Sequence, residues 1–205
     1  MRDTFHGWAA VDKMDIDVVA DLIITGRKAS EVRPDTWLFS HIGNSKNSLV
    51  VLDFGCGFGR NSFGMAMYGE NWTVIGYDNE GMLSRVPEFF AINYSGKIPN
   101  NLWFVSEWNQ IVLHKIDVIF CSLVLQHIYE DALMKYIQDF KQMTNKLIVT
   151  GRRFNDGKGK RSTWTILEEH GLIPDEFYGD CGQISYVAEG DPTEHNMAIY
   201  NLQAK

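Results

Sequence analysis

The sequence predicts an α/β fold in which helices cover both faces of a mostly parallel sheet. Short apolar segments rich in Val, Ile, Leu and Phe alternate with longer segments of helical periodicity, as parallel strands joined by crossover helices require. The segment Leu49–Phe54 runs directly into a glycine-rich turn. The next apolar segment ends in Asp78, after a stretch long enough for one crossover helix. These three observations favour a ligand site at the carboxyl ends of neighbouring strands.

Each element follows from its own pattern. An N-terminal helix is expected at residues 15–27, where Ile16, Val19, Ala20, Ile23 and Ile24 share one face. Strands are expected at residues 49–54, 73–78, 101–106, 116–122, 146–150, 172–177 and 196–203. Further helices are expected at residues 61–69, 79–94, 130–143 and 162–170. In the helix at 130–143, the inward residues should be Leu133, Met134, Ile137 and Phe140, and Gly171 should cap the last helix.

Composition favours one globular domain over residues 1–205, with an N-terminal helical region at 1–45 and a core at 46–205. The chain has 205 residues, 45% of them apolar and 22% charged, and a net charge of −7. Three widely spaced cysteines indicate free thiols, and no cluster has the spacing of a zinc site, so no metal is expected. The absence of a membrane-spanning apolar run or a secretory leader favours a cytoplasmic location.

The glycine-rich turn has the pattern Asp53-x-Gly55-x-Gly57-x-Gly59. Glycines let the main chain turn tightly and approach a ligand closely. A P-loop would need Lys-Ser/Thr after the last glycine, and this chain has Arg-Asn. A dinucleotide-binding G-x-G-x-x-G pattern fits only the first two glycines. The turn therefore predicts a nucleotide-like cofactor of another class.

The full pattern resembles motif I of the class I S-adenosylmethionine-dependent methyltransferases, (D/E)-x-G-x-G-x-G. Over about residues 45–203, the resemblance implies a Rossmann-like, doubly wound, seven-stranded sheet, mostly parallel with an antiparallel last strand. It also implies S-adenosylmethionine as the cofactor and S-adenosylhomocysteine as the product. The residues of the loop implied to bind the cofactor are Asp53, Gly55, Cys56, Gly57 and Gly59. Glu107, after the third predicted strand, is implied to bind it as well.

Two further segments complete the expected adenosine site. Asp78 can accept hydrogen bonds from both ribose hydroxyls, or it can cap the following helix, and the two roles are compatible. Asn79 matches the family position beside the adenine, although it is more polar than usual. Glu107 matches the acid that accepts from the adenine amino group, and Trp108 could offer its main-chain N–H while stacking on the ring. The alternative is that Glu107 is solvated and Trp108 covers the sheet edge.

The segment after the fourth strand resembles the S-x-V-L-x-H-I motif of small-molecule methyltransferases. The resemblance implies that Ser122 and Leu123 lie beside the methionine part of the cofactor. His127 is the candidate catalytic base, because imidazole titrates near neutral pH, although a histidine here can also be structural. Methyl transfer can also proceed by orientation alone. The chain lacks both (N/D/S)-P-P-(Y/F) and Pro-Cys at this position, which disfavours DNA amino- and cytosine-C5-methylating enzymes.

The acceptor site is expected to involve Trp8, in a family-like N-terminal lid, and the loop at residues 151–161. This loop holds five basic residues and one acid, and Arg152 or Arg153 could clamp a carboxylate or phosphate. The alternative is a solvated loop. The leading prediction is methyl transfer to an O, N or C nucleophile of a small molecule. The alternatives are RNA or protein methylation guided by the basic loop at 152–161, although the acidic net charge disfavours nucleic acid, or a cofactor-binding partner subunit without activity.

Overall fold

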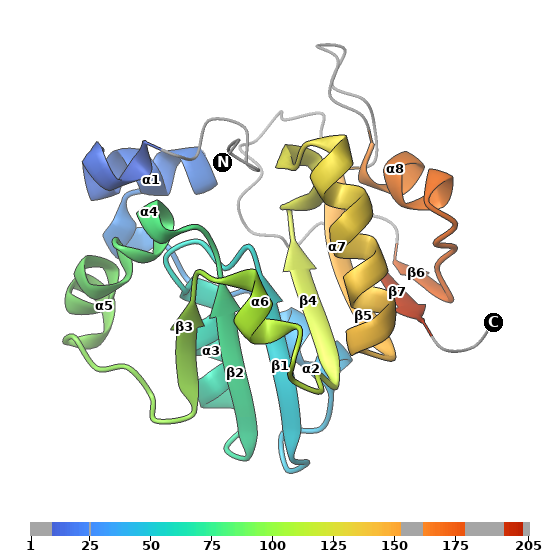
Figure 1. The fold of residues 1–205 in the computed structure, drawn as a ribbon. Helices are drawn as coiled ribbons and strands as arrows, with labels where there is room; N and C mark the ends of the chain where they lie inside the picture. Colours follow the sequence, from blue (N-terminus) through green and yellow to red (C-terminus); the bar gives the residue numbers. More distant parts are fainter. Residues whose placement is uncertain (1–9, 25, 153–161, 179–194, 203–205) are drawn as a thin grey trace.

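The computed structural model describes residues 10–24, 26–152, 162–178 and 195–202 (Figure 1). Seven strands form one sheet in the order β3-β2-β1-β4-β5-β7-β6. Their bounds are β1 Leu49–Phe54, β2 Trp72–Tyr77, β3 Leu102–Val105, β4 Val118–Ser122, β5 Lys146–Arg152, β6 Glu176–Tyr178 and β7 His195–Asn201. Strands β1 to β5 pair in parallel, and β7 runs antiparallel to both β5 and β6. The predicted doubly wound sheet with an antiparallel last strand is confirmed.

The helices lie in two layers, one on each face of the sheet. Their bounds are α1 Ile16–Ile23, α2 Phe39–Ile42, α3 Arg60–Tyr68, α4 Glu80–Leu83, α5 Val86–Tyr94, α6 Trp108–Ile111, α7 Glu130–Met143 and α8 Thr163–Glu169. Short 3-10 turns span Val11–Lys13, Ala29–Glu31, Thr36–Leu38 and Leu125–His127. Among the helices described, none is long and apolar enough to cross a bilayer.

Strand residues alternate between two apolar cores, as expected when both faces of a sheet are covered. Val51 and Phe120 face the core shared with α1, α2, α3 and α5. Leu52 and Ile119 face the core shared with α6, α7 and α8. In α7, Met134 is 47% exposed, so its predicted inward position was wrong; Leu133, Ile137 and Phe140 are buried as predicted. The buried face of α7 is thus narrower than the distribution of its apolar residues suggested.

Most predicted bounds shift by one or two residues, and three predicted elements differ from the structure by more than that for local reasons. The helix expected at 79–94 is two helices, because Pro87 stands in the first turn of α5 and lacks the N–H that a continuous helix needs. The helix expected to reach residue 27 ends at Ile23, since Gly26 has a φ of +81° and donates to the Asp21 carboxylate. The strand expected at 172–177 begins only at Glu176, because Leu172 still bonds to the end of α8.

The strand order reverses direction between β1 and β4. In open α/β sheets, such a switch point is where ligands bind, at the carboxyl ends of the strands. The turn after β1 lies at this edge, and α1 lies over the same edge near α4 (Figure 1). The topology therefore places the glycine loop, Asp78 and the segment after β4 around one site.

Candidate functional site

The glycine loop is held against the end of β2 by main-chain hydrogen bonds. Gly55 and Cys56 both donate their N–H groups to the carbonyl of Tyr77, at 2.8 and 3.0 Å. Gly57 donates its N–H to Asp78 Oδ2 at 2.8 Å. The loop that joins β1 to α3 is therefore built on the strand that carries Asp78.

Gly57 occupies a conformation that few other residues adopt. Its φ is +60°, and among the described residues a Cβ there would meet only Ile23 Cδ1 of α1, at 3.4 Å. At Gly57 the loop therefore presents main chain without a side chain, which suits close approach of a ligand. The contact also brings the N-terminal helix α1 directly over the loop.

Asp78 is buried, and its carboxylate is already in use within the protein. Besides Gly57, the main-chain N–H of Asn79 donates to Asp78 Oδ1 at 2.8 Å and the Asn79 side chain donates at 3.0 Å. Burial raises the pKa of Asp78 to about 7, although the bonds from Gly57 and Asn79 oppose this shift. Asn79 caps α4, because its Oδ1 accepts from Met82 N at 2.9 Å. Capping therefore belongs to Asn79, and Asp78 links the two loops.

Asp53 and Cys56 are buried beneath the loop. Ser62, in α3, donates to Asp53 Oδ2 at 2.5 Å, which ties β1 to the helix that follows it. Burial raises the pKa of Asp53 to about 6, and the bond from Ser62 lowers it. Burial also raises the pKa of the Cys56 thiol well above its usual range. Both side chains support the loop from within, so their predicted contact with a cofactor would involve the main chain of the loop.

Glu107 and Trp108 lie at the carboxyl end of β3, as predicted, but their side chains point to different environments. Glu107 is exposed at the start of α6. The indole of Trp108 is 9% exposed and packs among the rings of β1, β2 and α7. Its Nε1 donates to Asp139 Oδ2 at 2.7 Å. The indole has partners inside the protein, so only its main chain is placed to contact an adenine, and the predicted stacking is not retained.

The segment after β4 forms the other side of the site. Leu123 has a φ of +60° and donates its N–H to the carbonyl of Thr150 at 3.0 Å. Strained backbone of this kind in a non-glycine residue is concentrated at functional sites. Ser122 shares a hydroxyl–hydroxyl bond of 2.8 Å with Thr150. Val124 packs on Gly55, where a Cβ would lie 2.4 Å from it, so this segment abuts the glycine loop.

His127 ends the 3-10 turn after β4, and its ring lies beside an amide. Its Nε2 is 3.4 Å from Gln126 Nε2. Thr163, the first residue of α8, donates to Gln126 Oε1 at 3.1 Å. Gln126, Thr150 and Thr163 therefore join His127 at the ends of β4 and β5. Gln126, Thr150 and Thr163 were missed by the sequence analysis. These polar residues lie on separate elements, and nothing in their spacing along the sequence shows that their side chains meet.

A buried ion pair fixes the N-terminal region to the start of α3. Arg60 donates to Asp35 Oδ2 at 2.7 Å, and both side chains are buried. Asn61 accepts from Asp35 N at 2.8 Å. One signal for this group was visible in the sequence: the charged Arg60 and the polar Asn61 come directly after the glycine loop. The pair anchors residues 33–35 beside the loop.

The predicted acceptor residues are only partly within the described ranges. Trp8 and Arg153 lie outside them. The main chain of Arg152 ends β5 and pairs with His195 of β7. Among the residues described, no His, Cys, Asp and Glu side chains gather in a group that could hold a metal ion.

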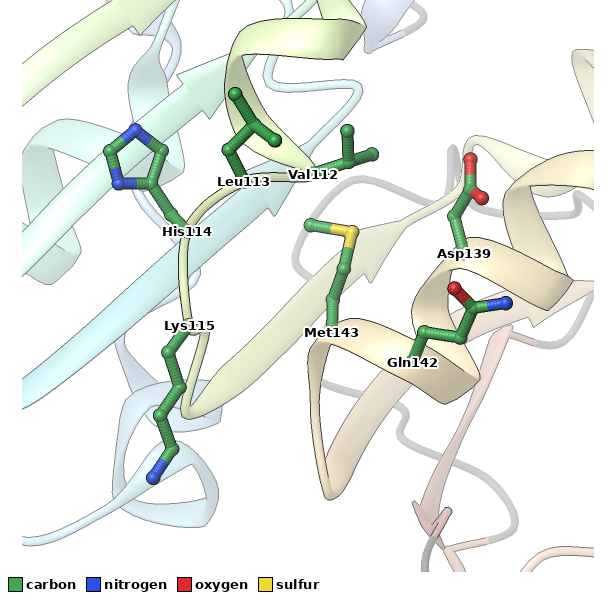
Figure 2. A pocket seen from close by; sticks show the side chains of 7 residues that line it. All are labelled: Val112, Leu113, His114, Lys115, Asp139, Gln142 and Met143. Atoms are coloured by element: carbon green, nitrogen blue, oxygen red, sulfur yellow. The ribbon is translucent and has the colours of Figure 1, made fainter.

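A pocket of about 310 Å³ lies away from this site. It is formed by the loop before β4 and the second half of α7, at the amino end of the strands (Figure 2). Its lining includes Val112, His114, Asp139 and Met143. Asp139 therefore lines this pocket and also accepts the hydrogen bond from the Trp108 indole, which follows the carboxyl end of β3.

Comparison with known proteins agrees with this architecture. A family model described as "Methyltransferase domain" matches residues 51–146, which include β1 to the start of β5. No curated protein sequence matches the chain. The matched range holds the glycine loop, Asp78, Glu107 and His127.

Solved structures similar to the chain share its fold at low identity. A SAM-dependent methyltransferase from Aquifex aeolicus is 18% identical with a TM-score of 0.60, over 91% of this chain and 98% of that one. The pyocyanin biosynthetic protein PhzM is 13% identical with a TM-score of 0.61, over 94% of this chain and 61% of the longer protein. Magnesium protoporphyrin IX methyltransferase from Synechocystis PCC 6803, solved with bound SAM, is 17% identical with a TM-score of 0.56, over 80% and 74%. Residues 51–146 therefore resemble a methyltransferase domain, and the solved structures share the fold of the whole chain; both findings support a relation to the class I S-adenosylmethionine-dependent methyltransferases.

Proposed function

We propose that the protein transfers the methyl group of S-adenosylmethionine to an oxygen, nitrogen or carbon nucleophile of a small molecule. The observation that carries this proposal is the bare main chain at Gly57, bonded to the Asp78 carboxylate at the switch point of the sheet. The residues present fit the cofactor: a loop that presents the main chain of Gly57 for close approach while its Cys56 and Phe58 side chains are buried, and a carboxylate for the ribose hydroxyls. When bound, the cofactor would supply a sulfonium methyl group: the acceptor would form a bond to the methyl carbon as the carbon–sulfur bond breaks in line with it, and the neutral thioether S-adenosylhomocysteine would leave.

The chain's own residues would bind and orient the reactants. Asp78 would hold the ribose, and Glu107 would accept a hydrogen bond from the adenine amino group. Ser122 and Leu123 would border the methionine end, where the backbone strain of Leu123 lies. His127 would accept the proton of an acceptor that needs to lose one, and orientation would supply much of the rate.

The proposed acceptor is a small molecule, bound on the side of the site away from the glycine loop. Two of the similar structures are named after small molecules: one is a magnesium protoporphyrin IX methyltransferase and the other is the pyocyanin biosynthetic protein PhzM. We propose that Trp8, Arg152 and Arg153 contribute to acceptor binding, and that residues 1–45 act as a lid. The position of Ile23 over Gly57 supports the lid. A basic loop could also guide RNA or a protein, and a strong loss of binding with salt would indicate that role.

Calorimetric titration tests the proposal directly. Purified protein is titrated with S-adenosylmethionine, S-adenosylhomocysteine and NADH. We expect micromolar binding of the two adenosyl ligands and none of NADH. Binding of NADH that displaces S-adenosylmethionine would overturn the proposal. Binding of S-adenosylmethionine without turnover across a broad acceptor panel would instead favour a partner subunit without activity.

A further inference from the structure

We propose that Asp139, in α7, is a positioning residue for the adenine end of the cofactor site and acts through the indole of Trp108. The inference rests on the proposed function, because it assumes that Glu107 and the main chain of Trp108 meet the adenine. Asp139 lies on a different helix from these residues and would not contact the cofactor itself. Its contribution would be to hold the loop that does.

The indole of Trp108 packs against aromatic rings in the layer between the sheet and α7, and its N–H is bonded to Asp139. Its ring centroid lies 5.5 Å from that of Phe54, 5.0 Å from that of Tyr77 and 5.0 Å from that of Tyr136. These contacts are edge-to-face or tilted, which is the favourable geometry for aromatic pairs. The Nε1–H would be left unpaired in this apolar layer without the Asp139 carboxylate at 2.7 Å. The carboxylate therefore selects the orientation of the ring.

Glu107 has no comparable anchor of its own. Its side chain is exposed, and within the described part of the chain no hydrogen bond to its carboxylate is recorded. It stands between the edge strand β3, which has only four residues, and α6, which also has four. Because Glu107 and Trp108 are consecutive, fixing the indole fixes the main chain from which the Glu107 carboxylate projects. The position of Glu107 thus depends on the bond between Trp108 and Asp139.

This dependence predicts an effect on base selectivity. A correctly placed Glu107 carboxylate accepts a hydrogen bond from the 6-amino group of adenine. Hypoxanthine carries a 6-oxo group at the same position, and two acceptors facing each other repel. The positioned loop should therefore bind S-adenosylhomocysteine more tightly than S-inosylhomocysteine, and a displaced Glu107 should lose part of that preference.

Asp139 also borders the pocket at the amino end of β4, where Figure 2 shows its carboxylate beside Gln142. Gln142 is exposed and lines the same pocket one helical turn further along α7, whereas the indole N–H of Trp108 is bonded to Asp139. Gln142→Ala is therefore a matched control for changes on this side of α7. Trp108→Phe keeps an aromatic ring in the cluster and removes the N–H donor together with part of the indole, and the double variant with Asp139→Ala separates the lost bond from the lost volume.

The test is calorimetric titration of the wild type, Asp139→Ala, Asp139→Asn, Trp108→Phe, the Asp139→Ala/Trp108→Phe pair and Gln142→Ala with both ligands. We expect Asp139→Ala and Trp108→Phe each to weaken S-adenosylhomocysteine binding by about tenfold, the size of one net hydrogen bond. The ratio of the two ligand affinities should fall in both variants. The double variant should be no weaker than the single ones, since both remove the same bond. Asp139→Asn keeps an acceptor oxygen and should retain most of the ratio, as should Gln142→Ala.

The outcomes separate the inference from the proposed function. A wild type that binds neither ligand would overturn the proposed function, and the inference with it. A wild type that prefers the adenosyl ligand, with Asp139→Ala and Trp108→Phe keeping the same ratio, would overturn the inference alone. If Asp139→Ala weakened the binding of both ligands by the same factor, the role of Asp139 would be purely structural. Should Asp139→Ala fail to fold in a thermal melt, Trp108→Phe and Asp139→Asn decide the question.

Discussion

The two sides of the candidate site are built by different means. On the cofactor side, the loop after β1 is held by main-chain bonds to Tyr77 and by the Asp78 carboxylate. On the side proposed to face the acceptor, the contacts are between side chains from separate elements, such as Gln126 in the 3-10 turn after β4 with Thr163 of α8. Main-chain geometry depends on a short run of sequence, whereas a side-chain cluster depends on how distant elements pack.

This difference explains why the sequence of the glycine loop indicates the cofactor class, whereas the residues on the proposed acceptor side do not identify the acceptor. The glycine spacing specifies the conformation of the loop almost residue by residue. The acceptor side can change its chemistry through single side chains while the sheet stays the same. The substitutions below separate the two sides, starting from the largest expected effect.

Gly57→Val should abolish cofactor binding. A β-branched residue at a positive φ costs about 1–2 kcal/mol in backbone strain, and its side chain also fills the space for the ligand, so we expect at least a hundredfold loss of affinity. Gly96→Val is the matched control, because Gly96 has a φ of +72° and no atom of the described part of the chain lies within 4 Å of its Cβ position. Calorimetry with S-adenosylhomocysteine would measure both. Unchanged affinity in Gly57→Val would contradict the placement of the cofactor.

Asp78→Ala should weaken cofactor binding by roughly 1.5–3 kcal/mol, the range for hydrogen bonds to a charged acceptor. The matched control is Asp117→Ala, since Asp117 also accepts a main-chain N–H at 2.8 Å, from Val50, but at the amino end of β1. Asp117→Ala should lower the free energy of unfolding and leave the cofactor dissociation constant within about twofold. Equal losses of affinity in the two variants would show that the effect is general destabilisation.

The pH dependence should have opposite signs for stability and for binding. Burial raises the pKa of Asp78 to about 7 and that of Asp53 to about 6, from 3.8. The folded protein therefore holds these protons more tightly than the unfolded chain, and its free energy of unfolding should fall as the pH rises from about 4 to about 7. The ribose contact needs the carboxylate, so affinity should rise over the same interval, by up to about tenfold per unit below the pKa of Asp78.

Denaturant unfolding and calorimetry from pH 5 to pH 8 would check both trends. Asp78→Asn should flatten the dependence of cofactor affinity on pH, and the stability should retain the part of its slope that belongs to Asp53. An affinity in the wild type that is constant across this range would argue against ionised Asp78 as the ribose acceptor.

Thr163→Val should have the smallest effect and should spare the cofactor side. The change removes the bond to Gln126 Oε1 and keeps the shape of the side chain against Gly151, so the free energy of unfolding should fall by about 1 kcal/mol. The affinity for S-adenosylhomocysteine should remain within about twofold. Thr163→Ser keeps the hydroxyl and serves as the control. A large loss of cofactor affinity in Thr163→Val would remove the distinction between the two sides.

Much of the fold followed from local patterns. The strand Leu49–Phe54 and the helix Glu130–Met143 have the predicted bounds, because each is delimited by a clear change of periodicity. The break at Pro87 shows the limit of periodicity alone, since the apolar pattern continues across a residue that cannot continue the helix. Met134 shows another limit, because an apolar residue at the edge of a stripe can remain exposed.

Sequence alone was enough for the order of the elements, the glycine loop and the positions of Asp78 and Glu107 along the chain, because spacing and backbone preference act over a few residues. The direction of each side chain was settled by packing. The Trp108 indole turned toward Asp139, the N-terminal region was tied down by Arg60 and Asp35, and Thr163 reached Gln126 across two elements. These contacts join residues that are 31 positions apart for Trp108 and Asp139, 25 for Arg60 and Asp35 (60 − 35), and 37 for Thr163 and Gln126. Only the closure of the sheet between its two helical layers brings such residues together.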